Sequence, residues 1–154
     1  ILSKDRNNPH SDDQNLVTTL ILERMNPDVH SVVEVLNPDK IHQMKVAGAN
    51  SAVCISQFRY NLMINEIQDP GVKDVLNELT SRSFGEQFYF VPVESMKSWD
   101  YRELALWGVD NGYSVIGIVR DEENFINCAG DFKIKGTDRA IIIGSKRIKS
   151  IRTA

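Results

Sequence analysis

The 154-residue sequence has no long hydrophobic run. No apolar stretch approaches the roughly 20 residues that a membrane-spanning helix requires. Ile1 and Leu2 are followed at once by Ser3 and Lys4, which is not the pattern of a secretory signal peptide. We therefore expect neither a membrane span nor export by a signal in this chain, and Ile1-Leu2 instead suggests the tail of a strand in a larger fold.

The sequence also has little cysteine and no excess of basic charge. Cys54 and Cys128 stand far apart, without the paired spacing of a zinc site, so we expect reduced thiols in a cytosolic setting. Eighteen basic residues against 21 acidic ones give a net charge of -3, whereas a nucleic-acid surface usually carries a basic face. The composition therefore argues against a nucleic-acid partner. His10, His30 and His42 share no metal-ligand spacing on one helix face.

Familiar catalytic motifs are missing as well. The sequence contains no G-x-S-x-G, no P-loop, no H-E-x-x-H and no complete G-x-G-x-x-G. With 42% hydrophobic and 25% charged residues, the composition is that of a packed soluble domain. We therefore expect a folded protein that is not an enzyme.

The first part, residues 1–56, predicts a helix and a βαβ unit. Ser11 and Gln14 have the spacing of a capping box, and apolar residues at helical spacing predict a helix over 11–25. The β-branched run at 29–36 predicts a buried strand, Asn37 and Pro38 begin a second helix, and 52–55 predicts another strand. A right-handed crossover makes these strands parallel, as in a partial Rossmann-like sheet.

Residues 57–84 predict two amphipathic helices joined by a turn at Asp69-Pro70-Gly71. Their apolar faces contact either the rest of the chain or a second subunit, and the sequence favours neither. The candidate interface residues are Phe58, Leu62, Val72, Leu76 and Leu79.

Residues 85–154 predict a small α+β lobe. Short strands are expected at 87–93, 114–119, 124–127, 132–135 and 140–143, with one helix at 101–109 and a hairpin turn at 120–123. The basic tail from Lys146 is expected to fray. The predicted fold class is thus α/β, with a partial Rossmann-like lobe, a helical crossover and a small α+β C-terminal lobe.

Three carboxylates are candidate ligand residues. Asp12 and Asp13 begin the first helix, and Glu34 lies within an apolar strand, where a buried carboxylate needs a partner. Glu34 either accepts hydrogen bonds from backbone groups or serves as an oxygen ligand for a hard cation such as calcium.

The order and spacing of several phrases resemble the RCK family, the regulators of potassium conductance. The family's "L-x-x-A-G-A-D" phrase is matched at Met44 and 47–50, with Asn50 replacing the aspartate. Residues 9–15 resemble its acidic helix start, 112–118 its "G-x-x-V-I-G-I" phrase, and 137–144 its last strand.

This resemblance also has departures. The glycine loop of nucleotide-binding members has no counterpart here, so nucleotide binding is not supported. In calcium-gated members two glutamates two residues apart on a strand hold the ion together with a loop acid; Glu34 matches the first, but Leu36 and Asn8 stand where the other two belong. The resemblance therefore implies at best a weak calcium site, and leaves the ligand unknown.

The resemblance implies a function without catalysis. We expect a ligand-sensing gating-ring domain at the cytoplasmic face of the membrane. Its expected partners are further copies of itself, as dimers within an octameric ring, and a potassium-channel pore domain. Two alternatives stay open: a peripheral regulatory subunit of a potassium uptake transporter, and a fragment of a nucleotide-dependent oxidoreductase.

Overall fold

The computed structural model describes residues 1–5, 8, 10–81, 83–94 and 99–152, and it divides into two units, Ile1–Val72 and Lys73–Ala154. The boundary lies within the helical pair predicted at 57–84. In the described residues no helix has the length and apolar character needed to cross a membrane.

The first unit is built around a parallel pair of strands, β1 (Val32–Val35) and β2 (Ser51–Cys54), in which Val33 lies opposite Ala52. Ile1 lies along the other edge of β1, because its amino group donates to the Val32 carbonyl and its own carbonyl accepts from the Glu34 amide. The connection between the strands contains a 3-10 turn, η1 (Pro38–Lys40), and α2 (Ile41–Val46). The predicted βαβ unit is confirmed, with a first strand shorter than expected.

Local signals in the sequence explain the limits of these elements. Asn37 caps η1, since its side chain accepts a hydrogen bond from the Asp39 amide, as predicted. After α2, Gly48 adopts a φ of +105°, and the amides of Gly48 and Ala49 donate to the carbonyls of Lys45 and Met44. This pair of bonds is a Schellman motif, which needs a residue in the left-handed region.

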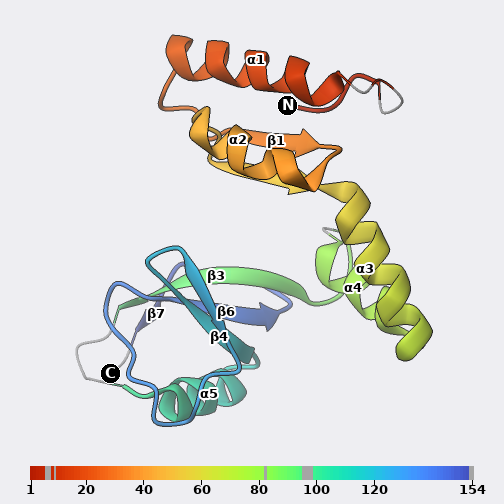
Figure 1. The fold of residues 1–154 in the computed structure, drawn as a ribbon. Coiled ribbons are helices and arrows are strands. Elements are labelled where there is room, and N and C mark those ends of the chain that lie inside the picture. Colours follow the sequence, from red (N-terminus) through yellow and green to blue (C-terminus); the bar gives the residue numbers. More distant parts are fainter. Residues whose placement is uncertain (6–7, 9, 82, 95–98, 153–154) are drawn as a thin grey trace. The chain divides into compact units, whose positions relative to one another are not determined.

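The helix α1 (Ser11–Met25) packs against β1 through an unusual face. Its buried residues are Ser11, Asp12, Asn15 and Thr19, and its apolar residues Val17, Leu20 and Ile21 are more than half exposed. Figure 1 shows α1 and α2 beside the two strands. The small core beneath them consists of Val33, Val35, Met44, Ala49 and Cys54.

The second unit contains a five-stranded sheet in the order β5-β4-β6-β3-β7. The strands are β3 (Gln87–Glu94), β4 (Ser114–Arg120), β5 (Glu123–Ile126), β6 (Arg139–Gly144) and β7 (Ile151–Arg152). Asp121 and Glu122 connect β4 to β5 with φ values of 50° and 67°. Two consecutive positive φ angles are typical of the type I′ turns of tight hairpins.

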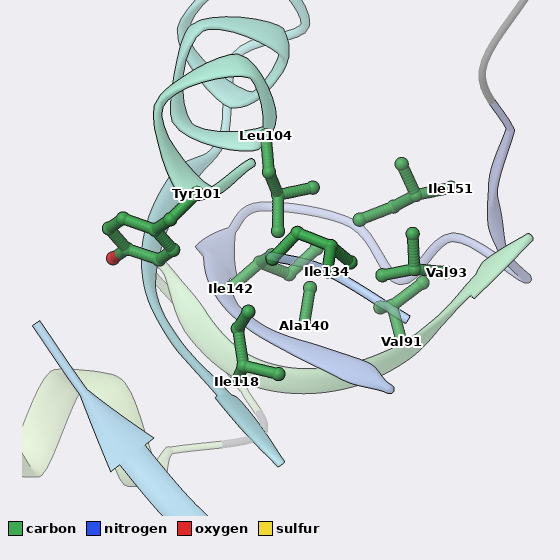
Figure 2. Close-up of a cluster of buried hydrophobic side chains, with 9 residues drawn as sticks. All are labelled: Val91, Val93, Tyr101, Leu104, Ile118, Ile134, Ala140, Ile142 and Ile151. Carbon is green, nitrogen blue, oxygen red and sulfur yellow. The ribbon is translucent and has the colours of Figure 1, made fainter. Parts of the chain in front are cut away.

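The helix α5 (Tyr101–Asp110) contributes Tyr101 and Leu104 to the core of this unit. Figure 2 shows Leu104 directed toward Ile134, Ile142 and Ala140, with the Tyr101 ring at the edge of the same cluster. Asp100 caps the helix in a true capping box: its side chain accepts from the Glu103 amide at 3.0 Å, and the Glu103 carboxylate accepts from the Asp100 amide at 2.8 Å.

Two predictions for this unit are wrong. Residues 132–135 form no ladder, because Phe132 and Ile134 bond to Tyr101 and Trp99 at the start of α5 instead; the one bridge there joins Lys133 to Asp100. The tail from Lys146 does not simply fray either. Ile151 is fully buried and, as part of β7, pairs with Val93.

Candidate functional site

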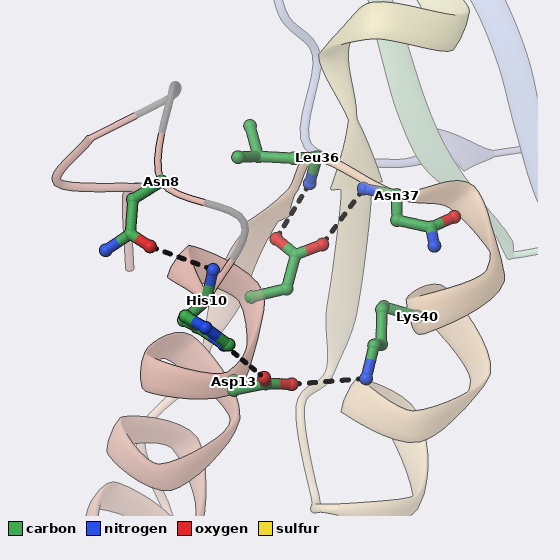
Figure 3. Close-up of polar contacts among 7 residues, drawn as sticks. Asn8, His10, Asp13, Leu36, Asn37 and Lys40 are labelled. Atoms are coloured by element: carbon green, nitrogen blue, oxygen red, sulfur yellow. Dashed lines mark hydrogen bonds and ion pairs between the residues drawn. The ribbon is translucent and has the colours of Figure 1, made fainter.

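The three candidate carboxylates are Asp12, Asp13 and Glu34, and Asp12 is bound directly after the end of β1. Its two carboxylate oxygens accept hydrogen bonds from the Leu36 amide at 2.8 Å and the Asn37 amide at 2.9 Å. Asp12 is 5% exposed. The first turn of α1 is thus fixed to the point where β1 ends and η1 begins (Figure 3).

This contact explains why the predicted capping box at Ser11 is wrong. His10, not Ser11, precedes the helix, and no side-chain cap bond forms there. Asp12 binds the Leu36 and Asn37 amides just after β1, and Ser11 is the first helical residue with a buried side chain. Within the part of the chain that the structure describes, the Ser11 hydroxyl has no hydrogen-bond partner.

Asp13 faces the opposite way, toward solvent. Its carboxylate lies 3.1 Å from Lys40 Nζ and 3.6 Å from His10 Nδ1, as Figure 3 shows. The hydrogen bond from Lys40, helped by the charge of Lys40 and the contact with His10, lowers the pKa of Asp13 below its ordinary value. Asp13 therefore serves a surface ion pair.

Glu34 is buried within β1, and its Oε2 accepts a hydrogen bond from the Ser3 amide at 3.0 Å. It lines two neighbouring cavities. One, of about 360 Å³, is mostly apolar and lies among Ile1, Leu2, Val32, Val53 and Ile55. The other, of about 240 Å³, is lined by Glu34, Leu36, Ile55, Ser56 and Arg59.

The place of the second cavity is informative. Leu36 follows the last residue of β1, and Ile55 begins α3 (Ile55–Gln68) directly after β2. Open parallel sheets bind their ligands at the carboxyl ends of the strands. The cavity with Glu34, Ser56 and Arg59 therefore occupies the position where this fold class accepts a ligand.

The three predicted ligand residues have separate partners: backbone amides for Asp12, Lys40 and His10 for Asp13, and the Ser3 amide for Glu34. Among the described residues, no three His, Cys, Asp or Glu side chains are grouped so that they could hold a metal ion. Calcium requires six to eight oxygen ligands. A cation site at these residues stays a prediction. Asn8, which the resemblance places near it, accepts from the His10 amide; Pro9 lies outside the described residues.

Sequence patterns did not identify Asn15 and Ser56. The Asn15 side-chain nitrogen donates to the Glu34 carbonyl at 2.9 Å and to the Ser3 hydroxyl at 3.2 Å. Ser56 Oγ donates to the Leu36 carbonyl at 3.2 Å. The small polar residues at 11, 12, 15 and 19 recur at helical spacing, which is the signal that could have identified a polar packing face.

The predicted interface residues lie on α3 and on α4 (Val72–Thr80), and neither helix buries a residue. Phe58 is 54% exposed. The other four, Leu62, Val72, Leu76 and Leu79, are half-buried. Contact of these side chains with a second subunit stays a prediction.

Comparisons with known proteins bear on the fold. No protein-family model and no curated protein sequence matches this chain. The human SLO3 gating ring matches with a TM-score of 0.72 and 12% identity, over 93% of this chain and 30% of that chain. Nearly all of this chain therefore has the fold found within that gating ring.

Two further matches have lower scores. A GsuK channel bound to NAD matches with a TM-score of 0.40 and 16% identity, over 93% of this chain and 24% of that one. The crystal structure of the GsuK RCK domain matches with a TM-score of 0.39 and 18% identity, over 94% of this chain and 29% of that chain. This chain covers less than a third of the length of each of these three proteins.

Proposed function

We propose that this chain is the ligand-sensing regulatory domain of a potassium channel, which couples ligand binding to pore opening and catalyses no reaction. One observation carries the proposal: the described fold matches a gating ring over 93% of the chain with a TM-score of 0.72. The phrases at 44–50, 112–118 and 137–144 support it independently, since they resemble the RCK family in order and spacing.

The proposal includes partners and a location. The domain works at the cytoplasmic face of the membrane, joined to a pore, and associates with copies of itself into dimers and a ring. The absence of buried residues from α3 and α4 supports self-association, because amphipathic helices gain stability by covering their apolar faces. Ligand binding opens the pore only to the extent that the ligand prefers the open ring.

The ligand site we propose is the pair of cavities that Glu34 lines, of which the smaller one lies at the carboxyl end of β1. Calcium, another cation and protons are candidate ligands. Asp12 is less suited to bind a cation directly, since both of its oxygens already accept backbone hydrogen bonds.

A thermal-shift panel tests the proposal. The purified chain is heated with CaCl2, MgCl2, other divalent salts, adenine nucleotides, or buffers from pH 5.5 to 8.5. A ligand selective for the native state raises the melting temperature by mass action, with a saturable concentration dependence. We expect one condition to do so, and expect substitution of Glu34 by glutamine to weaken that effect.

Two results would count against the proposal. A chain whose melting temperature responds to none of these ligands would not be a sensor of the proposed kind. Stabilisation by an adenine nucleotide that is unaffected by Glu34→Gln would instead favour the nucleotide-dependent alternative.

A further inference from the structure

The residue that follows β1, Leu36, is held from both sides by hydrogen bonds. Its amide donates to Asp12 Oδ1 at 2.8 Å, which connects it to the first turn of α1. Its carbonyl accepts from Ser56 Oγ at 3.2 Å and from Cys54 Sγ at 3.6 Å. A single peptide segment thus bridges α1 to the junction between β2 and α3.

The α1 side of this bridge is the more buried and more strongly hydrogen-bonded one. Asp12 also accepts from the Asn37 amide at 2.9 Å, and both Asp12 and Asn15 are 5% exposed. Figure 3 shows the Leu36 and Asn37 amides directed toward one carboxylate. Hydrogen bonds to a charged acceptor are among the stronger ones in proteins. The position of Leu36 therefore follows the position of α1.

The α3 side has fewer constraints. No side chain caps α3, and none of its residues is buried. Ser56 is exposed and lies in the first turn, where its bond to Leu36 supplies a fixed point. A helix with little packing of its own depends on such local bonds for the stability of its first turn.

We propose that Asp12, Leu36 and Ser56 form a mechanical link that transmits the position of α1 to the start of α3. The link deepens the proposed function, because α3 begins at the wall of the cavity that also contains Glu34 and Arg59. A ligand that displaces the end of β1 then changes how firmly α3 is anchored. Coupling of this kind is an energy between two sites and is reciprocal.

Amide hydrogen exchange on the purified chain tests the link. Asp12→Asn keeps the side-chain shape but presents an NH2 group to one of the two amides. We expect exchange at Arg59 and Tyr60, whose amides close the first turns of α3, to accelerate about tenfold. Tenfold corresponds to about 1.4 kcal/mol. Asp13→Asn is the matched control, since Asp13 bonds to the Lys40 side chain and not to the Leu36 or Asn37 amide; it should leave this exchange unchanged.

The reverse experiment stays valid if Asp12→Asn prevents folding. Ser56→Ala removes an exposed hydroxyl, and reciprocity requires it to accelerate exchange at the Leu36 and Asn37 amides. In the double variant, exchange at Arg59 should increase less than the product of the two single effects, because the bonds of Asp12 and Ser56 act in series through Leu36.

Two results would overturn the proposal. One is unchanged exchange at Leu36 and Asn37 in Ser56→Ala. The other is a double variant of Asp12→Asn and Ser56→Ala in which exchange at Arg59 increases by the full product of the two single effects. Neither depends on whether a ligand binds, so failure of the link and failure of the proposed function can be told apart.

Discussion

Asp138 is a fully buried carboxylate that is paired with Arg120. Its side chain is 0% exposed, and it accepts from Arg120 Nε at 2.8 Å, from Arg120 Nη2 at 2.7 Å and from the Lys135 amide at 2.7 Å. Burial alone would raise the pKa of Asp138, but the bonds from Arg120 and the Lys135 amide, together with the nearby positive charges, lower it overall. The hydrogen bonding to Asp138 in turn raises the pKa of the Arg120 guanidinium.

Asp138→Asn should therefore destabilise the second unit. Breaking a buried pair costs about 3–5 kcal/mol, and we expect the lower end because Arg120 is 17% exposed and can reach water. Urea unfolding at pH 7 measures the loss. Asp131→Asn, at an exposed carboxylate, is the control and should change the free energy of unfolding by less than about 0.5 kcal/mol.

The pH dependence follows from the direction of the shift. A carboxyl group with a lowered pKa in the folded state contributes stability that is complete above its unfolded pKa, about 3.9, and is lost as the pH falls through the lower folded value. Wild type should lose stability more steeply than Asp138→Asn below about pH 4. Parallel acid-unfolding curves for the two proteins would contradict this expectation.

A second expectation at this scale concerns calcium and Glu34. With Leu36 and Asn8 at the other two positions that the family resemblance relates to calcium, we expect no binding at micromolar concentration. Titration calorimetry with CaCl2 on wild type and Glu34→Gln measures it. Micromolar binding that disappears in Glu34→Gln would prove the expectation wrong.

At the scale of elements, the start of α5 depends on its capping box. Asp100→Ala removes the acceptor for the Glu103 amide, and the loss of an N-cap side chain costs about 1 kcal/mol. Chemical denaturation should report that loss. Asp110→Ala, at the exposed last residue of α5, should not destabilise, because a negative charge is unfavourable at a helix C-terminus. Equal losses in the two variants would contradict a specific role for the cap.

Elements with strong local signals were predictable from sequence. The turn at Asn37 and the glycine stop at Gly48 depend on neighbouring residues, and their positions are confirmed. The position of the helix at Ser11–Met25 is also confirmed, although its capping box does not form. Short segments whose partners are distant in sequence were not predictable. Residues 132–135 bond to the start of α5, and Ile151 pairs with Val93, so their structures depend on contacts that no local pattern encodes.

The candidate site was likewise predictable from sequence only in part. The sequence identified Asp12, Asp13 and Glu34 as unusual acids, and the structure places Asp12 and Glu34 in buried positions. Their partners could not be inferred, because Asp12 bonds to backbone amides 24 and 25 residues away. Every residue except proline has a backbone amide, so the residue types do not reveal which amides a carboxylate will bind. The bond of Ser56 to a carbonyl 20 residues away was hidden for the same reason.

At the scale of the whole molecule, self-association through α3 and α4 is the main expectation. Light scattering at micromolar concentration should give at least a dimer. Leu76→Asp should shift the population toward monomer, because it places an unpaired charge in an apolar contact. Asn77→Asp adds the same charge at the neighbouring exposed position of α4 and should leave the dimer intact. A wild-type monomer would remove the hypothesis.

The pairing of β7 with β3 has a consequence for how the protein folds while it is being synthesised. Val93 meets Ile151 across 58 positions of sequence, whereas β1 and β2 pair across 19. During synthesis the first unit can therefore complete its parallel pair while the second still lacks its last strand. Ile151 fills a position in the core cluster, paired with Val93, and that position stays open to water until Ile151 leaves the ribosome. We expect the nascent second unit to expose apolar surface until β7 pairs with β3, a condition that favours aggregation.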